Sequence, residues 1–169
     1  MIRRLLQAGA VAVLLAGTPG TAQIRRAPPA PAASTFTPRF EAVAETRLLM
    51  EGLTHANYKS VSKLLKDRPA DVDTWTFVRG QAIFIGESGN LLLLRPPKNS
   101  GRDTWMRLGM DMRDRATALA RSAAGRDYAA CKAALASLTA SCNRCHQTFR
   151  VPVDVAPEPD RNPNERDAE

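Results

Sequence analysis

Apolar residues recur at helical spacing in four segments of the chain, at about residues 40–66, 71–94, 102–124 and 127–150. In the last two segments the steps between apolar residues are all three or four, which places these side chains on one face of a helix. The alternation with a period of two that predicts a strand is absent from the sequence. The apolar positions of the last two segments are Trp105, Leu108, Met112, Ala116, Leu119 and Ala123, followed by Tyr128, Cys131, Leu135, Leu138, Cys142, Cys145 and Phe149.

The first two segments have less regular patterns. Two polar residues, Arg47 and Asn57, interrupt the apolar stripe of the first segment. The second segment begins near Asp71, ends before Pro96 and contains three glycines, each of which weakens a helix by about 1 kcal/mol relative to alanine. The apolar positions are Phe40, Val43, Met50, Leu53, Val61 and Leu64 in the first segment, and Trp75, Val78, Ala82, Ile85 and Leu91–Leu94 in the second.

These four amphipathic segments, joined by short breaks, can bury their apolar stripes only against one another. The pattern therefore predicts an all-α fold, with a four-helix bundle at residues 40–151. A Pro-rich stretch precedes this domain at residues 23–39, where we expect a flexible linker. The acidic residues 152–169 follow it, and there we expect a disordered tail.

The first 22 residues have the pattern of a signal peptide. Arg3 and Arg4 precede an apolar stretch at residues 5–16, and small residues follow at 20–22. The alternative is an uncleaved membrane anchor, but the apolar stretch is shorter than the ~20 residues that a membrane span needs. We therefore expect export to the periplasm, with no stable membrane span after the signal peptide is cleaved.

The formal net charge of +7 is unevenly distributed, with +6 in residues 40–151 and −4 in the tail, and the basic residues form no run. Basic residues alternate with acidic and small ones, which is typical of a solvated helix face. We therefore expect no nucleic-acid partner, and keep an acidic protein partner as the alternative.

The chemistry is concentrated in the pentapeptide Cys142-Asn143-Arg144-Cys145-His146, a C-x-x-C-H motif. Two thiols three residues apart lie about one helical turn apart, where they can bond to the two vinyl groups of one haem. The adjacent His146 can then bind the iron as its proximal ligand. The motif predicts one covalently bound haem c.

Three other interpretations of the motif are open. A thioredoxin-like redox site would need a βαβ pattern, which the sequence lacks. A zinc site would need a fourth ligand from Cys131 or His55. A disulfide between Cys142 and Cys145 is the simplest alternative.

The end of the last segment resembles the class II c-type cytochromes, the cytochrome c-prime superfamily. The resemblance lies in the haem motif, followed by Phe149 and Arg150, at the end of the last helix, and it extends over about residues 40–151. It implies an antiparallel four-helix bundle with the haem packed inside, in a periplasm-like compartment. The Pro-rich linker, the acidic tail and the glycines of the second segment depart from the usual pattern.

The resemblance also implies that the first helix faces the open side of the haem. Low-spin members of the superfamily have a Leu-Met pair there, which Leu49-Met50 matches, so Met50 is the expected distal iron ligand. Met50 also lies on the apolar stripe, although methionine is common as a core filler as well. His55 and Met112 are rival ligands, but His55 lies about 140° from Met50 around an α-helix.

Two arginines are candidates for pairing with the haem propionates. Arg47 lies one turn before Met50, and the resemblance suggests a basic residue there; Arg150 follows the haem motif. Buried propionates need cationic partners, and a solvated arginine is the alternative for each. The third cysteine, Cys131, is expected to be a small buried core residue.

Together these observations predict a periplasmic monohaem cytochrome that transfers electrons and is not an enzyme. If Met50 does not ligate, the alternative is a five-coordinate, cytochrome c-prime-like protein that binds nitric oxide or carbon monoxide. We expect other redox proteins as partners. The sequence leaves open whether the protein is a monomer or a homodimer.

Overall fold

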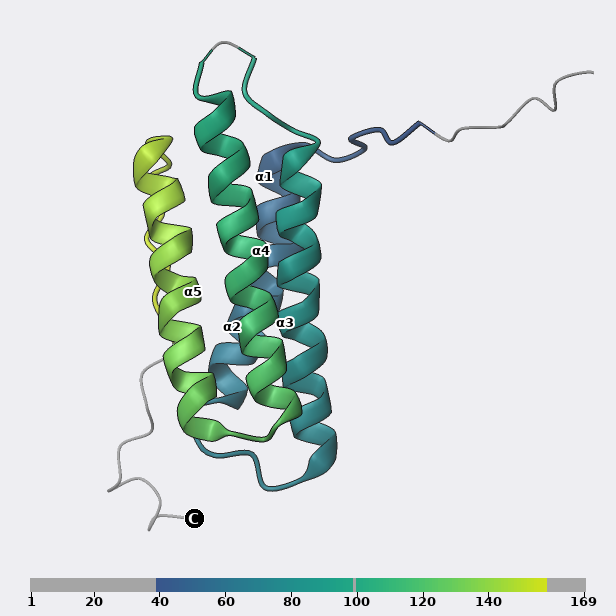
Figure 1. Ribbon diagram of the computed structural model, residues 1–169, viewed down its shortest axis with the longest axis vertical. Coiled ribbons are helices and arrows are strands. Elements are labelled where there is room, and N and C mark those ends of the chain that lie inside the picture. Colours follow the sequence, from purple (N-terminus) through teal and green to yellow (C-terminus); the bar gives the residue numbers. More distant parts are fainter. Residues whose placement is uncertain (1–38, 99, 158–169) are drawn as a thin grey trace, which may run out of the picture. The chain divides into compact units, whose positions relative to one another are not determined.

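The computed structural model describes residues 39–98 and 100–157, and most of them are helical (Figure 1). The predicted signal peptide, nearly all of the predicted linker and residues 158–169 of the predicted tail lie outside the described residues. Within the described residues there are helices and no strands, which confirms the all-α class.

Four helical segments follow one another along the described part of the chain. The first consists of three pieces without a break between them, the middle one a π-helix whose backbone hydrogen bonds join residues five apart. The pieces are α1 (Thr46–Leu49), η1 (Met50–His55) and α2 (Ala56–Leu64), and the later segments are α3 (Val72–Leu93), α4 (Arg102–Ala124) and α5 (Tyr128–Thr148).

Side-chain caps explain where two of these helices begin. The carboxylate of Asp71 accepts hydrogen bonds from the backbone N–H and the hydroxyl of Thr74, both at 2.7 Å. At the start of α5, the carboxylate of Asp127 accepts from the backbone N–H of Ala130 at 3.0 Å. Each cap satisfies an N–H group that has no partner within its own helix.

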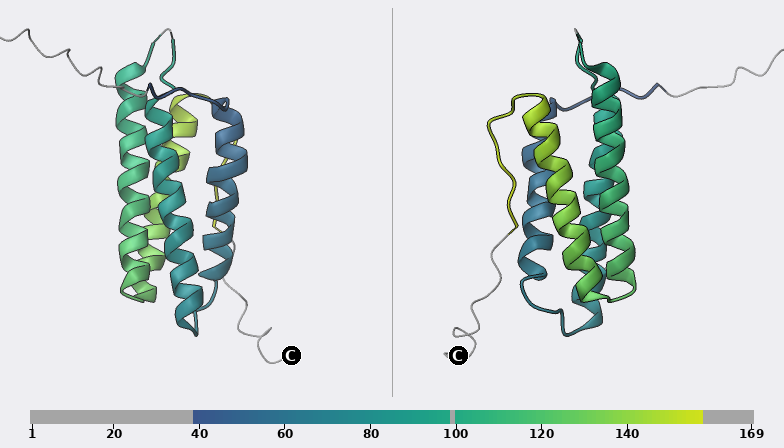
Figure 2. Two further views of the ribbon diagram at one scale, coloured as in Figure 1. Left: turned by 90° about the vertical axis from the view of Figure 1, so that its right-hand side faces the viewer. Right: turned by 60° about the vertical axis from the view of Figure 1, so that its left-hand side comes forward.

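The helical segments pack side by side, as the views in Figures 1 and 2 show. The most extensive contact is between α3 and α4, α4 also packs on α5, and both α2 and η1 pack on α3. Each of the four segments supplies buried apolar side chains to one shared core. The largest fully buried apolar side chains are Leu65, Ile85, Leu119, Leu138, Val61 and Val78.

Two glycines allow α3 and α4 to approach closely. A Cβ atom added at Gly89 would lie 2.9 Å from both the Cβ of Arg113 and the carbonyl oxygen of Gly109. A Cβ added at Gly109 would lie 3.1 Å from the side chain of Leu93. Gly89 lowers the intrinsic helix stability of α3, but the close packing of α3 on α4 requires it.

The first helix begins later than the apolar pattern predicts. Phe40 and Val43, two members of the predicted stripe, are 82% and 96% exposed and precede α1. The guanidinium of Arg95, just beyond the end of α3, donates to the carbonyl oxygen of Ala44 at 3.0 Å. The chain just before α1 is thus hydrogen-bonded to the end of α3 in a non-helical conformation.

Candidate functional site

The haem motif occupies the last two turns of α5. Cys142 is buried and packs in the core, while Cys145 is half-buried. Both are free thiols, so the structure does not contain the disulfide that was one alternative for the motif. The two sulfur groups are therefore available for other covalent chemistry.

The surroundings of these cysteines keep them protonated. Burial, assisted by the neighbouring Cys145, raises the pKa of Cys142 to about 12. Burial also raises the pKa of Cys145 above its usual value. At neutral pH both are neutral thiols rather than thiolates, which distinguishes them from the reactive cysteines of redox enzymes.

His146 has a fixed hydrogen-bond partner. Its Nδ1 lies 2.8 Å from the carbonyl oxygen of Val153. A carbonyl oxygen can only accept, so Nδ1 is the donor in this hydrogen bond, and the neutral tautomer compatible with it keeps the lone pair on Nε2. A neutral imidazole with a free Nε2 is the form that binds iron.

The carbonyl of Val153 belongs to residues 151–157, which leave the end of α5 and run back along it (Figure 2). We call these residues the C-terminal strap. The side chain of Asn143, within the haem motif, donates to the carbonyl oxygen of Val155 at 2.8 Å and accepts from its N–H at 2.7 Å. Val155 is half-buried and packs against the core. The first residues of the tail that we expected to be disordered thus have specific contacts.

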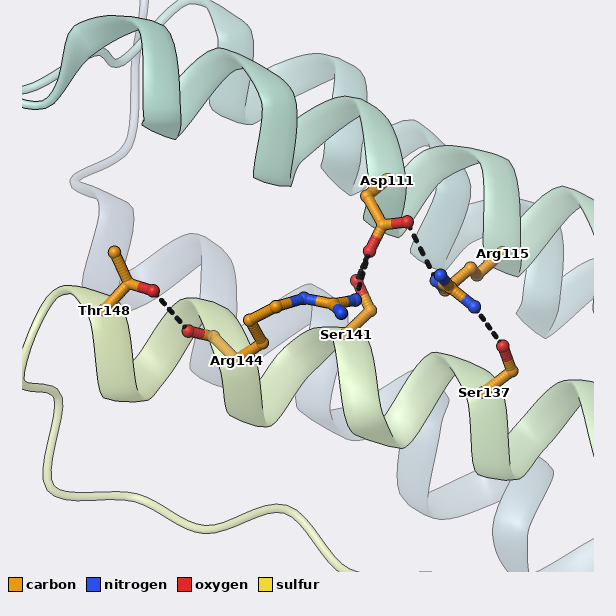
Figure 3. A network of polar contacts seen from close by, with 6 residues as sticks. All are labelled: Asp111, Arg115, Ser137, Ser141, Arg144 and Thr148. Carbon is orange, nitrogen blue, oxygen red and sulfur yellow. Dashed lines mark hydrogen bonds and ion pairs between the residues drawn. The ribbon is translucent and has the colours of Figure 1, made fainter.

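Asp111 of α4 connects its helix to α5 at the haem motif (Figure 3). The carboxylate of Asp111 accepts from Ser141 at 2.6 Å, from Arg144 at 2.8 Å and from Arg115 at 2.9 Å. Arg115 also donates to Ser137. Partial burial alone would raise the pKa of Asp111, but the hydrogen bonds from Ser141 and Arg115 and the two positive charges outweigh it and lower this pKa.

A buried tyrosine joins the first helical segment to α5. The hydroxyls of Tyr58 and Thr139 are 2.6 Å apart, and Thr139 donates its own proton to the carbonyl of Leu135 at 2.8 Å. Tyr58 is therefore the donor to Thr139. Burial raises the pKa of Tyr58, the Thr139 hydrogen bond partly opposes this rise, and the nearby Cys142 adds to it. Cys142 and the first helical segment thus share one buried region.

The Leu49-Met50 pair lies where α1 passes into the π-helix. Leu49 is buried and Met50 is half-buried, packed against the core. The hydroxyl of Thr54 donates to the carbonyl of Leu49 at 3.4 Å within this wider turn. The structure therefore places Met50 at the edge of the core.

The π-helix changes the comparison between Met50 and His55. The 140° separation holds only for a continuous α-helix. Met50 and His55 are instead the two ends of η1, a π-helix whose hydrogen bonds join residues five apart. In a π-helix, residues five apart lie about one turn apart, so these two side chains lie near the same face. What distinguishes the two side chains is burial, because His55 is exposed and Met50 is half-buried. The other rival, Met112, is buried in the core on α4.

Both candidate propionate partners are exposed. The Nε of Arg47 donates to the carboxylate of Glu51 at 2.8 Å. Arg150 follows the end of α5 in a left-handed conformation, with a φ of 55°, where the chain turns into the C-terminal strap. Their pairing with haem propionates stays a prediction.

The structure also bears on the zinc alternative. Cys131 is fully buried in the core, as expected, and burial raises its pKa to about 11. His55 is exposed on the first helical segment. In the described part of the chain, no three His, Cys, Asp or Glu side chains are grouped so as to hold a metal ion.

The donor set fits a covalently attached haem. It comprises two free thiols one helical turn apart and an imidazole whose Nδ1 proton is already engaged. Asn143 and Asp111 are site residues that sequence reasoning missed. Asn143 is part of the motif but is not one of its defining positions, and Asp111 lies 30 residues before Ser141 with no motif to mark it.

Comparison with known proteins gives one match. The family described as Cytochrome C' matches residues 100–150, which cover α4, α5 and the haem motif. No curated protein and no solved structure matches the chain. The match supports a cytochrome c-prime-type class II cytochrome, and this family implies covalently bound haem. Members are typically periplasmic, and among the described residues no helix is long and apolar enough to cross a membrane.

Proposed function

We propose that this cytochrome of the c-prime type is a periplasmic electron-transfer protein with one haem c. The observation that carries the proposal is the Cys142–His146 motif, which lies within the matched residues and presents two free thiols and one oriented imidazole. When bound, the haem supplies the ferric–ferrous couple. The chain's own residues hold the group and set its surroundings, and none acts as an acid, base or nucleophile.

Each residue of the site has a distinct part. Cys142 and Cys145 tether the haem through thioether bonds, and His146 offers Nε2 as the proximal ligand. Arg47 and Arg150 neutralise the propionates. The Glu51 ion pair of Arg47 is exposed, so exchanging it for a propionate costs little.

The architecture that we propose is an antiparallel four-helix bundle, with the haem between the first helical segment and α5. Two hydrogen bonds join α5 to the first helical segment and to the turn that directly follows it, which supports their proximity. Besides the bond between Tyr58 and Thr139, the hydroxyl of Tyr128 donates to the carbonyl of Lys66 at 3.0 Å.

Met50 is the distal ligand in this proposal. Its support is a half-buried position packed against the core, on the segment that Tyr58 links to α5 close to Cys142. A thioether is a soft ligand that favours ferrous iron and therefore raises the reduction potential.

Mass spectrometry and absorption spectroscopy of the protein isolated from the periplasm test the proposal. We expect one haem added to a chain that begins near Gln23, and a low-spin spectrum. Met50→Ala should give a high-spin iron that accepts carbon monoxide and has a lower reduction potential. His55→Ala, an exposed residue of the same helical segment, is the control and should change neither property.

Other results would contradict parts of this proposal. A chain without added haem would contradict a cytochrome. A low-spin iron in Met50→Ala, together with a high-spin iron in His55→Ala, would make His55 the ligand. A high-spin iron in the unmodified protein would favour the alternative function, binding of nitric oxide or carbon monoxide by a five-coordinate haem.

A further inference from the structure

Two contacts of the haem motif are not explained by haem attachment itself. Asn143 has no role in the thioether bonds, yet its amide makes two hydrogen bonds with one backbone residue, Val155. The Nδ1 of His146 could donate to water, yet it contacts the carbonyl oxygen of Val153 at 2.8 Å. Both contacts lead to the C-terminal strap.

We propose that the C-terminal strap is a positioning device for the proximal histidine. In this arrangement Asn143 fixes the strap at Val155, and the strap presents the carbonyl of Val153 to His146. The inference rests on the proposed function only in that it takes His146 as the iron ligand. Asn143 is then a positioning residue, because it acts on His146 through the strap.

Several contacts fix the position of the Val153 carbonyl. Arg150, at a φ of 55°, reverses the chain at the end of α5, and the N–H of Val151 donates to the carbonyl of His146 at 2.8 Å. Two residues after Val153, Val155 is held by Asn143 and packs against the core. A carbonyl fixed on both sides is a better orienting partner than solvent, because it allows one direction of the imidazole ring.

This hydrogen bond has a predictable effect on the ligand. A fixed acceptor at Nδ1 selects the tautomer with Nε2 free and makes the imidazole a stronger electron donor. A stronger donor stabilises ferric iron and lowers the reduction potential. Loss of the strap should therefore raise the reduction potential and leave the imidazole ring free to rotate.

Three variants of the full haem protein test the proposal. Asn143→Ala removes both contacts with Val155, and a chain ending at Pro152 lacks the Val153 carbonyl. A chain ending at Pro157 keeps the strap and is the control for truncation. Gln147→Ala, which removes an exposed amide from the same helix, is the control for substitution.

The measurements are the reduction potential and two hydrogen-exchange rates by nuclear magnetic resonance. The Nδ1 proton of His146 is observed in the ferrous protein, with carbon monoxide added if the iron is high-spin. We expect slow exchange of this proton and of the Val155 N–H in the unmodified protein and both controls. Asn143→Ala and the chain ending at Pro152 should lose slow exchange at Nδ1 and have a more positive reduction potential.

Unchanged Nδ1 exchange and an unchanged potential in the chain ending at Pro152 would overturn the proposal. An unprotected Val155 N–H in the unmodified haem protein would also overturn it, because the strap would then not be docked. These outcomes are distinct from failure of the proposed function, which mass spectrometry reveals as a chain without haem.

Discussion

Among single residues, Asp111 connects the haem motif to α4 through charged hydrogen bonds. Asp111→Asn should lower the free energy of unfolding by about 1–2 kcal/mol. This is less than loss of a fully buried charged network would cost, because the arginine partners of Asp111 are partly exposed to solvent. Urea unfolding of the haem protein at pH 7 measures this loss. Asp114→Asn, which alters an exposed ion pair with the adjacent Arg113, is the matched control and should change stability far less.

The Asp111 contribution also depends on pH. Its pKa is lower in the folded protein than the usual value of about 3.9, so its stabilising effect is fully present above that value. The effect is lost as the pH falls through the lower pKa of the folded state. The stability difference between the unmodified protein and Asp111→Asn should therefore shrink below about pH 4. A difference that stays constant down to pH 2 would contradict this assignment.

The sequence predicts the residues of the site only where their partners are close along the chain. Cys142, Cys145 and His146 form a local motif whose chemistry follows from its spacing. The contacts of Asn143 and Asp111 depend on residues 12 and 30 positions away, which only the packing of the chain brings together. The partner of His146 is a backbone carbonyl, which every residue has and no side-chain pattern marks.

At the scale of helices, Gly89 is the position most sensitive to added volume. Gly89→Ala should destabilise the protein by about 1–3 kcal/mol, because the new Cβ would lie 2.9 Å from atoms of α4. Gly86→Ala is the matched control, since its Cβ would meet neighbours at 3.6–3.7 Å, an ordinary contact. That variant should be neutral or more stable by up to about 1 kcal/mol, because alanine favours a helix. Thermal unfolding of both variants is the measurement, and equal stabilities would contradict the close packing.

The helices differ in how far their bounds follow from the sequence. The starts of α3 and α5 are marked by Asp71 and Asp127, whose caps are local, and the predicted bounds lie within two residues of the observed ones. The first segment has no such side-chain cap, so no local signal in the sequence marks where it starts. The π-helix within it could not be predicted either, because the apolar spacing assumes an unbroken α-helix.

For the whole molecule, the net positive charge predicts how electron exchange responds to salt: cleavage of the predicted signal peptide removes Arg3 and Arg4 and lowers the charge from +7 to +5. The rate of reduction of an anionic mediator such as ferricyanide should fall as ionic strength rises, because salt screens the attraction between opposite charges. Exchange with a neutral mediator should change little and is the control. Stopped-flow measurements between low and physiological ionic strength give both rates. A ferricyanide rate that rises with salt would mean that the haem edge is surrounded by negative charge.

The packing of the four helical segments is easier to predict from the sequence than the course of the C-terminal strap. Four apolar stripes and short connections leave few ways to bury the apolar surface, and the helices do share one core. The C-terminal strap was not predictable, because an acidic, Pro-containing stretch is typical of disorder. Only Val155 among its residues is partly buried, and one apolar residue leaves no periodic pattern.

The wider turn at Met50–His55 also affects how this chain should be aligned with others. A turn closed between residues five apart contains one residue more than an α-helical turn. In a homologue with an unbroken α-helix at this place, the residues equivalent to Leu49 and Tyr58 would both face the core only if one residue fewer separated them. An alignment that forbids gaps inside helices would then shift every position on one side of this turn by one. Sequence searches that allow a single-residue gap at residues 50–55 should therefore match the first helix of distant relatives more accurately.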